Sequence, residues 1–335
     1  GSLDGANTRT RDKRYLMELR YLLEELPDAQ VDGDPGVILE GIHCDSRRVG
    51  LGDLFVAVRG GQEEDRHLYV GDAVARGARA VVVEDEVNCG GATRVQVADC
   101  RTALARLSAR FYDFPSRHML NIGITGTNGK TTTAFLLRSV LEAAGLSCGY
   151  VGTLGGRIDG ELQQLGNTTP EAAELHRLLR LMVDRGKRAV VLEVSSHGLA
   201  LKRVEGIPFH AAVFSNLTRD HLDFHGTWEQ YFAAKAQLFE NMPEDGVAVV
   251  NLDDPMAAKL IRRTRARVLT YGYDEAAQVR LRQVEPALSG AILSFDTPLG
   301  PLTTEAHLAG GLNHYNTMAA LATGLALELD PRAVC

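Results

Sequence analysis

Apolar and polar positions follow one another along this chain in short patterns that predict both helices and strands. Residues 14–26 have apolar positions at helical spacing, and Pro27 interrupts the pattern. Three short β-branched runs follow, and we expect them to be strands: residues 52–59, 80–84 and 94–97. A helical segment at residues 69–76 separates the first two, and another helical segment follows the third and extends through Phe111. This alternation predicts a small α/β unit.

In the second part of the chain, predicted strands and helices again alternate, and the strands are mostly apolar. Residues 112–117 break the pattern with a proline and form the predicted linker. Beyond them, four apolar runs are typical of buried strands: residues 120–124, 188–193, 210–215 and 246–251. Helical segments alternate with these strands, which predicts a mostly parallel sheet. We therefore expect an α/β protein of two domains, residues 1–116 and residues 117–335, without internal repeats.

Composition and charge narrow the classes of function. The 335 residues carry a formal net charge of −7 with a pI near 5.8, which argues against a nucleic-acid partner or an anionic membrane surface. No apolar run approaches the roughly 18 to 20 residues that span a bilayer. The five cysteines show neither Cys-x-x-Cys pairs nor a secreted framework. We expect reduced thiols in a cytoplasmic, monomeric protein, and we interpret Gly1-Ser2 as a cloning remnant.

The most specific motif is a glycine-rich turn, Gly126-Thr-Asn-Gly-Lys-Thr-Thr132, between an apolar strand and a helical segment. Glycines let the backbone approach a polyphosphate, and the helix beginning near Lys130 adds the positive end of its dipole. We expect Lys130 to neutralise the β- and γ-phosphates of a nucleotide and the Thr131 hydroxyl to bind Mg²⁺. The strict pattern requires glycine where Ile124 stands, so the turn is a variant of the phosphate-binding loop.

Three further polar groups follow apolar strands, where open α/β sheets bind their ligands. Glu193 ends a strand and is a natural Mg²⁺ ligand, although a carboxylate there could equally cap the next helix. Residues 215–225 are dense in Asp and His, and some of these must be caps or solvated residues. Lys235 stands among apolar neighbours in a helical segment at residues 231–239, a pattern that usually marks a surface lysine.

Six motifs occur in a fixed order along the chain: G-x-T-G-T-N-G-K-T-T, T-T-P, E-V-S-S-H-G-L, N-L-T-R-D-H-L-D-F-H-G, Y-x-x-A-K-x-x-L-F and G-x-N-x-x-N. In these motifs the chain resembles the Mur ligases, and most closely those that add the third, diamino residue of the peptidoglycan stem peptide. The segment Asp45-Ser-Arg47, followed by residues 52–57, resembles the uridine-nucleotide domain of that family. The resemblance covers roughly residues 40–328.

The resemblance implies an ATP and magnesium site. Its ATP-binding residues are Gly126, Thr127, Asn128, Gly129, Lys130, Thr131, Thr132, Asn313 and Asn316. One Mg²⁺ would lie on Thr131 and Glu193, and His221 would bind a second divalent ion; Lys235 is also a metal ligand in its modified form. Lys235 would carry a carbamate formed with CO₂, which replaces the surface-lysine interpretation with a metal-binding one. The implied catalytic residues are Lys130, Glu193, His221 and Lys235.

The resemblance also implies a site for UDP-N-acetylmuramoyl-dipeptide. The matching positions are Ser46, Asn167, Thr168, Thr169, Ser195 and Arg203 and, less closely, Gly61 and Gln62. Residues 62–67 depart from the D-G-H sequence usual in the family, and Leu201 replaces a polar residue of some relatives. These departures concern the contacts to substrate and leave the implied reaction class unchanged.

The implied reaction is ATP-dependent amide bond formation. ATP would phosphorylate the side-chain carboxylate of the D-Glu unit, and the amine of meso-diaminopimelate or L-lysine would then expel phosphate. Family members have a third, Rossmann-like domain that selects the amino acid and has no counterpart in these residues. We therefore expect a two-domain fragment that binds UDP-dipeptide and ATP weakly without turnover. The sequence does not indicate which of the two diamino acids is the substrate.

Other classes of function remain open on the sequence. A folylpolyglutamate synthase-like ligase shares the ATP and carbamate chemistry, but the Asp45-Ser-Arg47 segment argues against it. A non-catalytic Mur-like nucleotide-binding subunit would be expected to lack Glu193, His221 or Lys235, and all three are present. A generic kinase or GTPase is disfavoured because the chain has no N-K-x-D motif.

Overall fold

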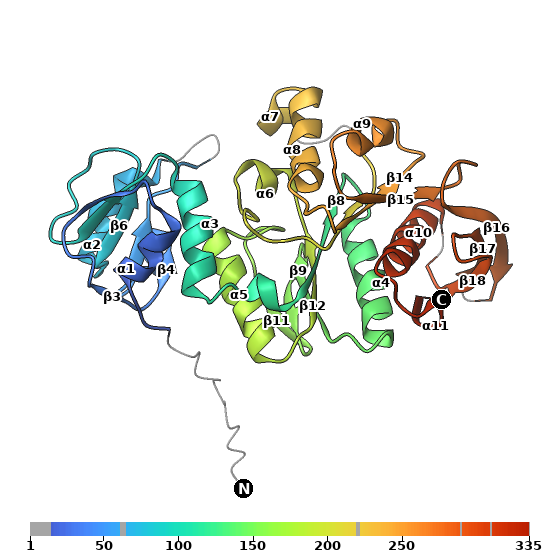
Figure 1. Ribbon diagram of the computed structural model, residues 1–335, viewed down its shortest axis with the longest axis horizontal. Helices are drawn as coiled ribbons and strands as arrows, with labels where there is room; N and C mark the ends of the chain where they lie inside the picture. The colour runs from blue at the N-terminus through green and yellow to red at the C-terminus, as the bar shows by residue number, and fades with distance from the viewer. Residues whose placement is uncertain (1–14, 61–64, 219–221, 289, 309, 335) are drawn as a thin grey trace, which may run out of the picture. The chain divides into compact units, whose positions relative to one another are not determined.

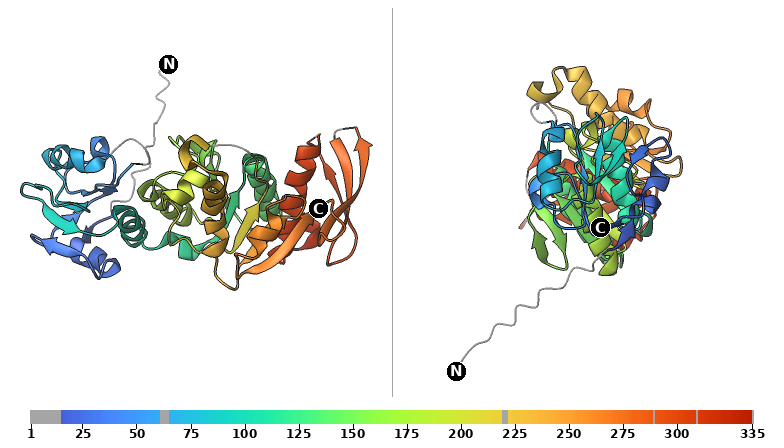
Figure 2. Two further views of the ribbon diagram at one scale, coloured as in Figure 1. Left: turned by 90° about the horizontal axis from the view of Figure 1, so that it is seen from above. Right: turned by 90° about the vertical axis from the view of Figure 1, so that its left-hand side faces the viewer.

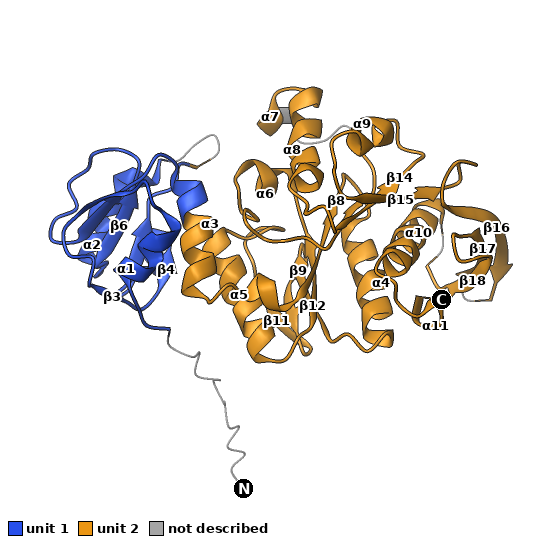
Figure 3. Ribbon diagram, in the orientation of Figure 1, with its two compact units in different colours: residues 1–59, 65–103 blue, residues 60–64, 104–335 orange. Residues whose placement is uncertain are grey.

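The computed structural model of the protein describes residues 15–60, 65–218, 222–288, 290–308 and 310–334. The chain forms two compact units, one of residues 1–59 and 65–103 and one of residues 60–64 and 104–335 (Figure 3). The division falls within helix α3 (Cys100–Phe111). A domain boundary after residue 116 remains a prediction.

The first unit is built on a five-stranded sheet of order β2-β7-β6-β5-β4, parallel except for the edge pair β2–β7. Its strands are β2 (Gln30–Asp32), β4 (Ile42–His43), β5 (Leu54–Val56), β6 (Ala80–Val83) and β7 (Thr93–Gln96). Helix α2 (Val70–Ala75) and residues of β5 and β6 share a small apolar core. The predicted strands at residues 52–59, 80–84 and 94–97 are confirmed, as is the helical segment at residues 69–76.

The helix predicted at residues 14–26 is confirmed only at residues 19–25. The structure has a strand β1 (Met17–Glu18), a four-residue helix α1 (Leu19–Leu22) and a single 3₁₀ turn at Leu23–Glu25. Strand β1 pairs with β3 (Ile38–Leu39), and the amides of Leu19 and Arg20 donate to the carbonyls of Val37 and Pro35. Pairing with the segment at residues 35–39 satisfies these amides, so tertiary contacts override the helical spacing.

The second unit contains an eleven-stranded sheet of order β11-β10-β9-β12-β8-β13-β14-β15-β16-β17-β18 (Figure 1). The contiguous strands from β9 to β16 are parallel, and antiparallel strands extend both edges. The central parallel strands are β8 (Leu120–Thr125), β9 (Cys148–Gly152), β12 (Ala189–Glu193), β13 (Ala211–Phe214), β14 (Val247–Asn251) and β15 (Arg267–Gly272). The predicted buried strands and the mostly parallel sheet are confirmed.

Helices cover both faces of this sheet because its central strands are apolar on both sides. One core packs β8, β12 and β13 against α4 (Lys130–Ala143) and α10 (Gly311–Ala326), which lie side by side (Figures 1 and 2). The opposite core involves α5 (Ala172–Asp184), α6 (Ser196–Ala200), α8 (Trp228–Glu240) and α9 (Ala257–Ile261). Short helices α7 (Leu222–His225) and α11 (Pro331–Val334) complete the set in the described residues.

The sequence patterns did not predict the antiparallel extensions of the sheet. They are β10 (Gly155–Ile158) and β11 (Glu161–Gln163) at one edge, and β17 (Gly290–Asp296) and β18 (Leu302–Ala306) at the other. Strand β16 (Val279–Ala287), which is parallel to β15 and pairs with β17, was not predicted either. Among the described residues, none of the helices combines the length and apolar character needed to cross a lipid bilayer. Cys89, Cys100 and Cys148 are buried free thiols, Cys44 is also buried, and Cys335 lies outside the described residues.

The order of the strands reverses direction at β8. The chain places β9 and β12 on one side of β8 and β13 on the other, and the glycine-rich turn follows β8 directly. In open α/β sheets, ligands bind beyond the carboxyl ends of the strands at such a switch point. The carboxyl ends of β8, β12 and β13 are therefore the place to look for a site.

Candidate functional site

Two glycines shape the loop between β8 and α4. Gly126 has a φ of 147° and Gly129 has a φ of 86°, and residues other than glycine rarely adopt these backbone conformations. A Cβ atom at Gly126 would collide with Ser215 Oγ, and one at Gly129 would collide with the amide oxygen of Asn316. Gly129 immediately precedes α4, so the turn lies at the positive end of that helix. This geometry suits the close approach of a phosphate group.

The loop is also fixed to the end of β13. The Thr127 amide donates to the Asn216 carbonyl at 2.8 Å, and the Asn128 amide donates to Asn216 Oδ1 at 2.9 Å. Ser215 Oγ in turn donates to the Asn128 carbonyl at 2.7 Å. These bonds connect the loop after β8 to the residues that follow the neighbouring strand β13.

Two lysines converge on one carbonyl of the loop. Lys130 Nζ donates to the Gly126 carbonyl at 2.9 Å and to the Thr127 carbonyl at 3.0 Å. Lys235 Nζ, from α8, also donates to the Gly126 carbonyl at 2.9 Å. Lys235 is only 2% exposed, so the surface-lysine interpretation is wrong. Helix α8 thus brings a buried amine against the loop.

Glu193 ends β12 as a buried carboxylate. Its Oε1 accepts from the Tyr150 hydroxyl and from the Thr153 amide at 3.3 Å, and its Oε2 accepts from Thr153 Oγ1 at 3.1 Å. It is 1% exposed, and within the described chain no Lys or Arg forms an ion pair with it. The capping alternative is not what the structure shows, because Ser195 caps the next helix by accepting from the Gly198 amide at 3.0 Å.

Tyr150, in β9, connects Glu193 to the start of α4. Its hydroxyl donates to Glu193 and forms a hydrogen bond with the side chain of Thr131. Burial and the bond to Glu193 raise the pKa of Tyr150, so the phenol keeps its proton. The residues predicted to hold one Mg²⁺, Thr131 and Glu193, are therefore brought together through this phenol.

Asn313 and Asn316 lie at the first turns of α10, beside the loop. Asn316 Nδ2 donates to Asn313 Oδ1 at 3.0 Å, and Asn316 Oδ1 accepts from Thr133 Oγ1 at 3.2 Å. Asn316 is 3% exposed and lies against Gly129. The predicted role of Asn313 and Asn316 in binding ATP stays a prediction.

Several predicted substrate residues gather next to Glu193. Thr169 Oγ1 donates to the Glu193 carbonyl at 2.9 Å and accepts from the Ser195 amide at 3.0 Å. Arg203 donates to the Thr169 carbonyl at 2.9 Å and pairs with Glu171 at 2.9 Å. Thr168 Oγ1 lies 3.1 Å from Thr153 Oγ1. Asn167 is exposed and has no hydrogen bond to these residues in the described structure.

The other predicted residues lie elsewhere or outside the described structure. Ser46 belongs to the first unit, where it is 8% exposed and begins a 3₁₀ turn capped by Asp45. Arg47 pairs with Asp45 at 2.8 Å and holds the pKa of that carboxyl at about 2. Gly61, Gln62 and His221 lie outside the described residues.

Comparisons with known proteins decide the family. The model of the Mur ligase middle domain matches residues 124–324, which include the loop, Glu193, Lys235 and both asparagines of α10. The chain belongs to the Mur ligase family. Its Mur ligase fold is α/β with a mostly parallel sheet, as the strand order also shows.

Two curated Mur ligases are similar over most of the chain. The UDP-N-acetylmuramoyl-L-alanyl-D-glutamate--2,6-diaminopimelate ligase of Geobacter metallireducens is 42% identical over 325 residues, covering 95% of this chain and 63% of the relative. The corresponding L-lysine ligase of Staphylococcus haemolyticus is 38% identical over 310 residues, covering 91% of this chain and 63% of the relative. The chain thus spans about 63% of the length of these relatives.

A solved Mur ligase structure has the same fold. The structure of a UDP-N-acetylmuramoyl-L-alanyl-D-glutamate--2,6-diaminopimelate ligase superposes with a TM-score of 0.81 at 31% identity, covering 94% of this chain and 65% of that chain. The fold of this chain is therefore similar to that of a solved Mur ligase over 94% of its residues.

Sequence reasoning missed three residues that contact the candidate site residues. Tyr150 and Thr153 carry no motif, and they reach Glu193 only because β9 and β12 are neighbours in the sheet. Tyr231 stands in the motif Y-x-x-A-K and contacts both Thr127 and Lys235. Only Tyr231 could have been found from the sequence, because it lies one helical turn before Lys235.

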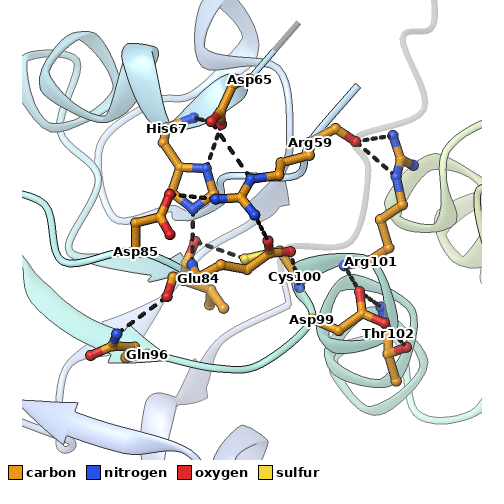
Figure 4. Close-up of polar contacts among 11 residues, drawn as sticks. Arg59, Asp65, His67, Glu84, Asp85, Gln96, Asp99, Cys100, Arg101 and Thr102 are labelled. Carbon is orange, nitrogen blue, oxygen red and sulfur yellow. Dashed lines mark hydrogen bonds and ion pairs between the residues drawn. The ribbon is translucent and has the colours of Figure 1, made fainter. Parts of the chain in front are cut away.

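A second charged cluster in this Mur ligase lies in the first unit (Figure 4). Ligand atoms of Asp65, His67 and Asp85 lie within 4.8 Å of one another. Both ring nitrogens of His67 already have partners, Asp65 at 2.5 Å and the Glu84 amide at 2.8 Å. Arg59 contacts Asp85 and pairs with Glu84 at 3.0 Å. We interpret the cluster as an ion-pair network that holds the unit together.

Proposed function

We propose that the chain provides the ATP-binding and UDP-substrate-binding parts of an ATP-dependent ligase of peptidoglycan synthesis. The ligase would join a diamino acid to UDP-N-acetylmuramoyl-L-alanyl-D-glutamate. One observation carries the proposal: the glycine loop, Lys130, Lys235 and Glu193 meet at the carboxyl ends of β8 and β12. The reaction named for the curated relatives supplies the substrates.

The loop Gly126, Thr127, Asn128, Gly129, Lys130, Thr131 and Thr132 would hold the ATP phosphates. Lys130 now bonds two loop carbonyls, and it can swing to a phosphate that approaches the loop amides. Asn313 and Asn316 would lie on the adenine side, as the family resemblance implies. The two glycine positions support this assignment because a Cβ atom at either would collide with Ser215 or Asn316, against which the loop packs.

The donor set fits a bound Mg²⁺. Glu193 is a fully buried carboxylate whose described partners are neutral hydroxyl and amide groups. An unpaired buried charge is costly, and a divalent cation would supply the missing positive charge. Thr131 and Glu193 would hold this ion beside the phosphates. We propose that it neutralises the charge that develops at the γ-phosphate.

Lys235 would take part as a carbamate and, together with His221, would hold a second Mg²⁺. Its amine is buried and directed at the phosphate loop, which supports a role in the site. The carboxylate that CO₂ adds would supply anionic oxygen ligands where the ammonium would repel a metal. His221 enters this proposal through its place in the family motif alone.

In the proposed reaction the residues position groups and balance charge. The D-Glu side-chain carboxylate attacks the γ-phosphorus of ATP, ADP leaves, and an acyl phosphate forms. The amine of the diamino acid then attacks the acyl carbon, phosphate leaves, and the amine loses a proton to give an amide. Ser46, Gly61, Gln62, Asn167, Thr168, Thr169, Ser195 and Arg203 would hold the UDP-sugar-dipeptide. Relatives specific for diaminopimelate and for L-lysine both match, so either amine remains a candidate.

A binding experiment tests the proposal. Titration calorimetry of the 335-residue chain with UDP-N-acetylmuramoyl-L-alanyl-D-glutamate should show binding that weakens in Arg203→Ala. Lys202→Ala, which changes the neighbouring cation, is the matched control. A parallel titration with UDP-glucose separates recognition of the dipeptide from recognition of uridine diphosphate. Equal affinity for both ligands, unaffected by Arg203→Ala, would contradict the proposed substrate.

A further inference from the structure

Tyr231 is a fully buried tyrosine that the proposed reaction does not yet use. It lies in the first turn of α8, which Thr227 caps by accepting from the Gln230 amide at 3.2 Å. The i, i+4 spacing places Tyr231 on the same helical face as Lys235. Both side chains point at the loop that follows β8, and each contacts a different residue of it.

The hydroxyl of Tyr231 is bonded to the loop. It lies 3.1 Å from Thr127 Oγ1, which also accepts from the Thr218 amide at 3.0 Å and donates to the Thr218 carbonyl at 3.2 Å. Because Thr127 has one hydroxyl proton and gives it to that carbonyl, the Tyr231 hydroxyl is the donor to Thr127. The phenol thus orients the second residue of the loop.

The ring of Tyr231 contacts the amine of Lys235. Lys235 Nζ lies 4.7 Å from the ring centroid and 2.9 Å from the Gly126 carbonyl. A cation over an aromatic face is attracted by the negative charge of the ring, more strongly where water is excluded. The ring and the carbonyl therefore hold the amine between them.

We propose that Tyr231 is a positioning residue that joins α8 to the phosphate loop. Its hydroxyl sets the orientation of Thr127, and its ring sets the position of Lys235 Nζ. The inference rests on the proposed function, in which Thr127 lies in the ATP loop and Lys235 takes up CO₂. The Tyr231 role itself follows from the contacts of its hydroxyl with Thr127 and of its ring with Lys235.

The position of the Tyr231 ring also affects the carbamate form of Lys235. Conversion of the ammonium by CO₂ forms an N–C bond and releases two protons, leaving an anionic carbamate with one N–H. That N–H can keep the bond to the Gly126 carbonyl. The negative face of the Tyr231 ring repels the new carboxylate, so its oxygens turn away from the ring. Tyr231 would thereby direct the carbamate oxygens as well as hold the amine.

Two substitutions separate the hydroxyl from the ring. Tyr231→Phe removes only the hydroxyl, and Tyr231→Leu removes the ring as well. Tyr271→Phe is the matched control, because Tyr271 is another fully buried tyrosine whose hydroxyl donates to the Phe214 carbonyl at 3.1 Å. Thermal unfolding identifies any variant that has lost its fold.

The first measurement is acetylation of Lys235 by acetic anhydride in CO₂-depleted buffer, read by peptide mass spectrometry. Exposed Lys259 is the internal reference. We expect labelling of Lys235 to rise about fivefold in Tyr231→Leu through loss of the ring contact, and to stay at the wild-type value in Tyr231→Phe and Tyr271→Phe. Equal labelling in Tyr231→Leu and wild type would overturn the role of the ring.

The second measurement is calorimetric affinity for magnesium and a non-hydrolysable ATP analogue. Tyr231→Phe should bind about fivefold more weakly through loss of one hydrogen bond, whereas Tyr271→Phe should match the wild type. Equal affinities in all three would overturn the role of the hydroxyl. A wild-type chain that binds no nucleotide would contradict the proposed function instead, and the labelling result would still decide the contact between Tyr231 and Lys235.

Discussion

Two groups of carboxylates, one in each unit, differ in how their negative charge is balanced. In the first unit, Arg59 contacts Asp85 and pairs with Glu84, so each negative charge has a positive neighbour (Figure 4). In the second unit, Glu193 is buried among hydroxyl and amide donors without such a neighbour in the described structure. Carboxylates that pair with basic side chains of the same chain indicate a structural cluster. A buried carboxylate without such a pair indicates a binding site for a cation.

The largest effect should come from Lys130→Ala. Removing this cation from the phosphate loop should cost about 3 kcal/mol of binding free energy, or about a hundredfold in affinity for the magnesium complex of an ATP analogue. Lys187→Ala is the control, because Lys187 bonds Ser147 at 3.0 Å and is outside the loop. Calorimetry of both variants makes the comparison, and an unchanged affinity in Lys130→Ala would place the phosphates elsewhere.

The two units should also differ in their response to acid. Burial lowers the pKa of His176 in α5 to about 4, from 6.5, so folding keeps this imidazole neutral. Below pH 6.5 this histidine is protonated in the unfolded chain but remains neutral in the folded chain. The free energy of unfolding therefore falls as the pH approaches 4. We expect a loss of about 2 kcal/mol between pH 7 and 4.5, measured by urea unfolding of the second unit.

His176→Leu is the test of that prediction. It removes the titrating imidazole and places an apolar side chain in the same buried position. The loss of stability between pH 7 and 4.5 should then become smaller by about the same amount. An identical pH dependence in the variant would assign the titration to other groups.

Glu193→Gln should have a smaller and more selective effect. With magnesium present, the affinity for the ATP analogue should fall about tenfold, and without magnesium it should not change. The unfolding free energy should not decrease, because a neutral amide is less costly to bury than a carboxylate. Asp85→Asn in the first unit is the matched control and should leave nucleotide affinity unaltered. A tenfold loss with and without magnesium would contradict a metal role.

The smallest effect belongs to the first unit. The hydrogen bond from Arg47 holds the pKa of Asp45 at about 2, below its usual 3.8. The pair therefore stabilises the fold above pH 3.8 and ceases to do so as the pH falls through 2. Because Asp45 is partly exposed, we expect about 0.5 kcal/mol after screening. Urea unfolding of Asp45→Asn at pH 5 and pH 2.5 measures it, and an equal difference from wild type at both values would refute it.

Much of the second unit could be predicted from its sequence. Apolar runs predict β8, β12, β13 and β14, and the glycine-rich turn predicts the loop, because these features arise from neighbouring residues. Strands β16 to β18 escaped prediction because β16 and β18 expose most of one face and are polar there. The helix predicted at residues 14–26 begins only at Leu19, because Met17 and Glu18 pair with residues 38–39 as strand β1.

The candidate site could be predicted in part. Lys130 and Glu193 follow from their positions after apolar strands. The burial of Lys235 does not follow from its helix, and only the family resemblance reversed the surface interpretation. Tyr150 and Thr153 reach Glu193 across 43 and 40 residues of sequence. Such contacts depend on which strands pair, and no local pattern encodes that choice.

The most direct test of the account is calorimetric titration of the unmutated 335-residue chain with a non-hydrolysable ATP analogue, with and without Mg²⁺. The central claim is that the carboxyl ends of β8 and β12 form a magnesium–nucleotide site. We predict saturable binding at one site per chain, at least about tenfold weaker when magnesium is removed. No binding at millimolar nucleotide, or binding that is indifferent to magnesium, would contradict the claim.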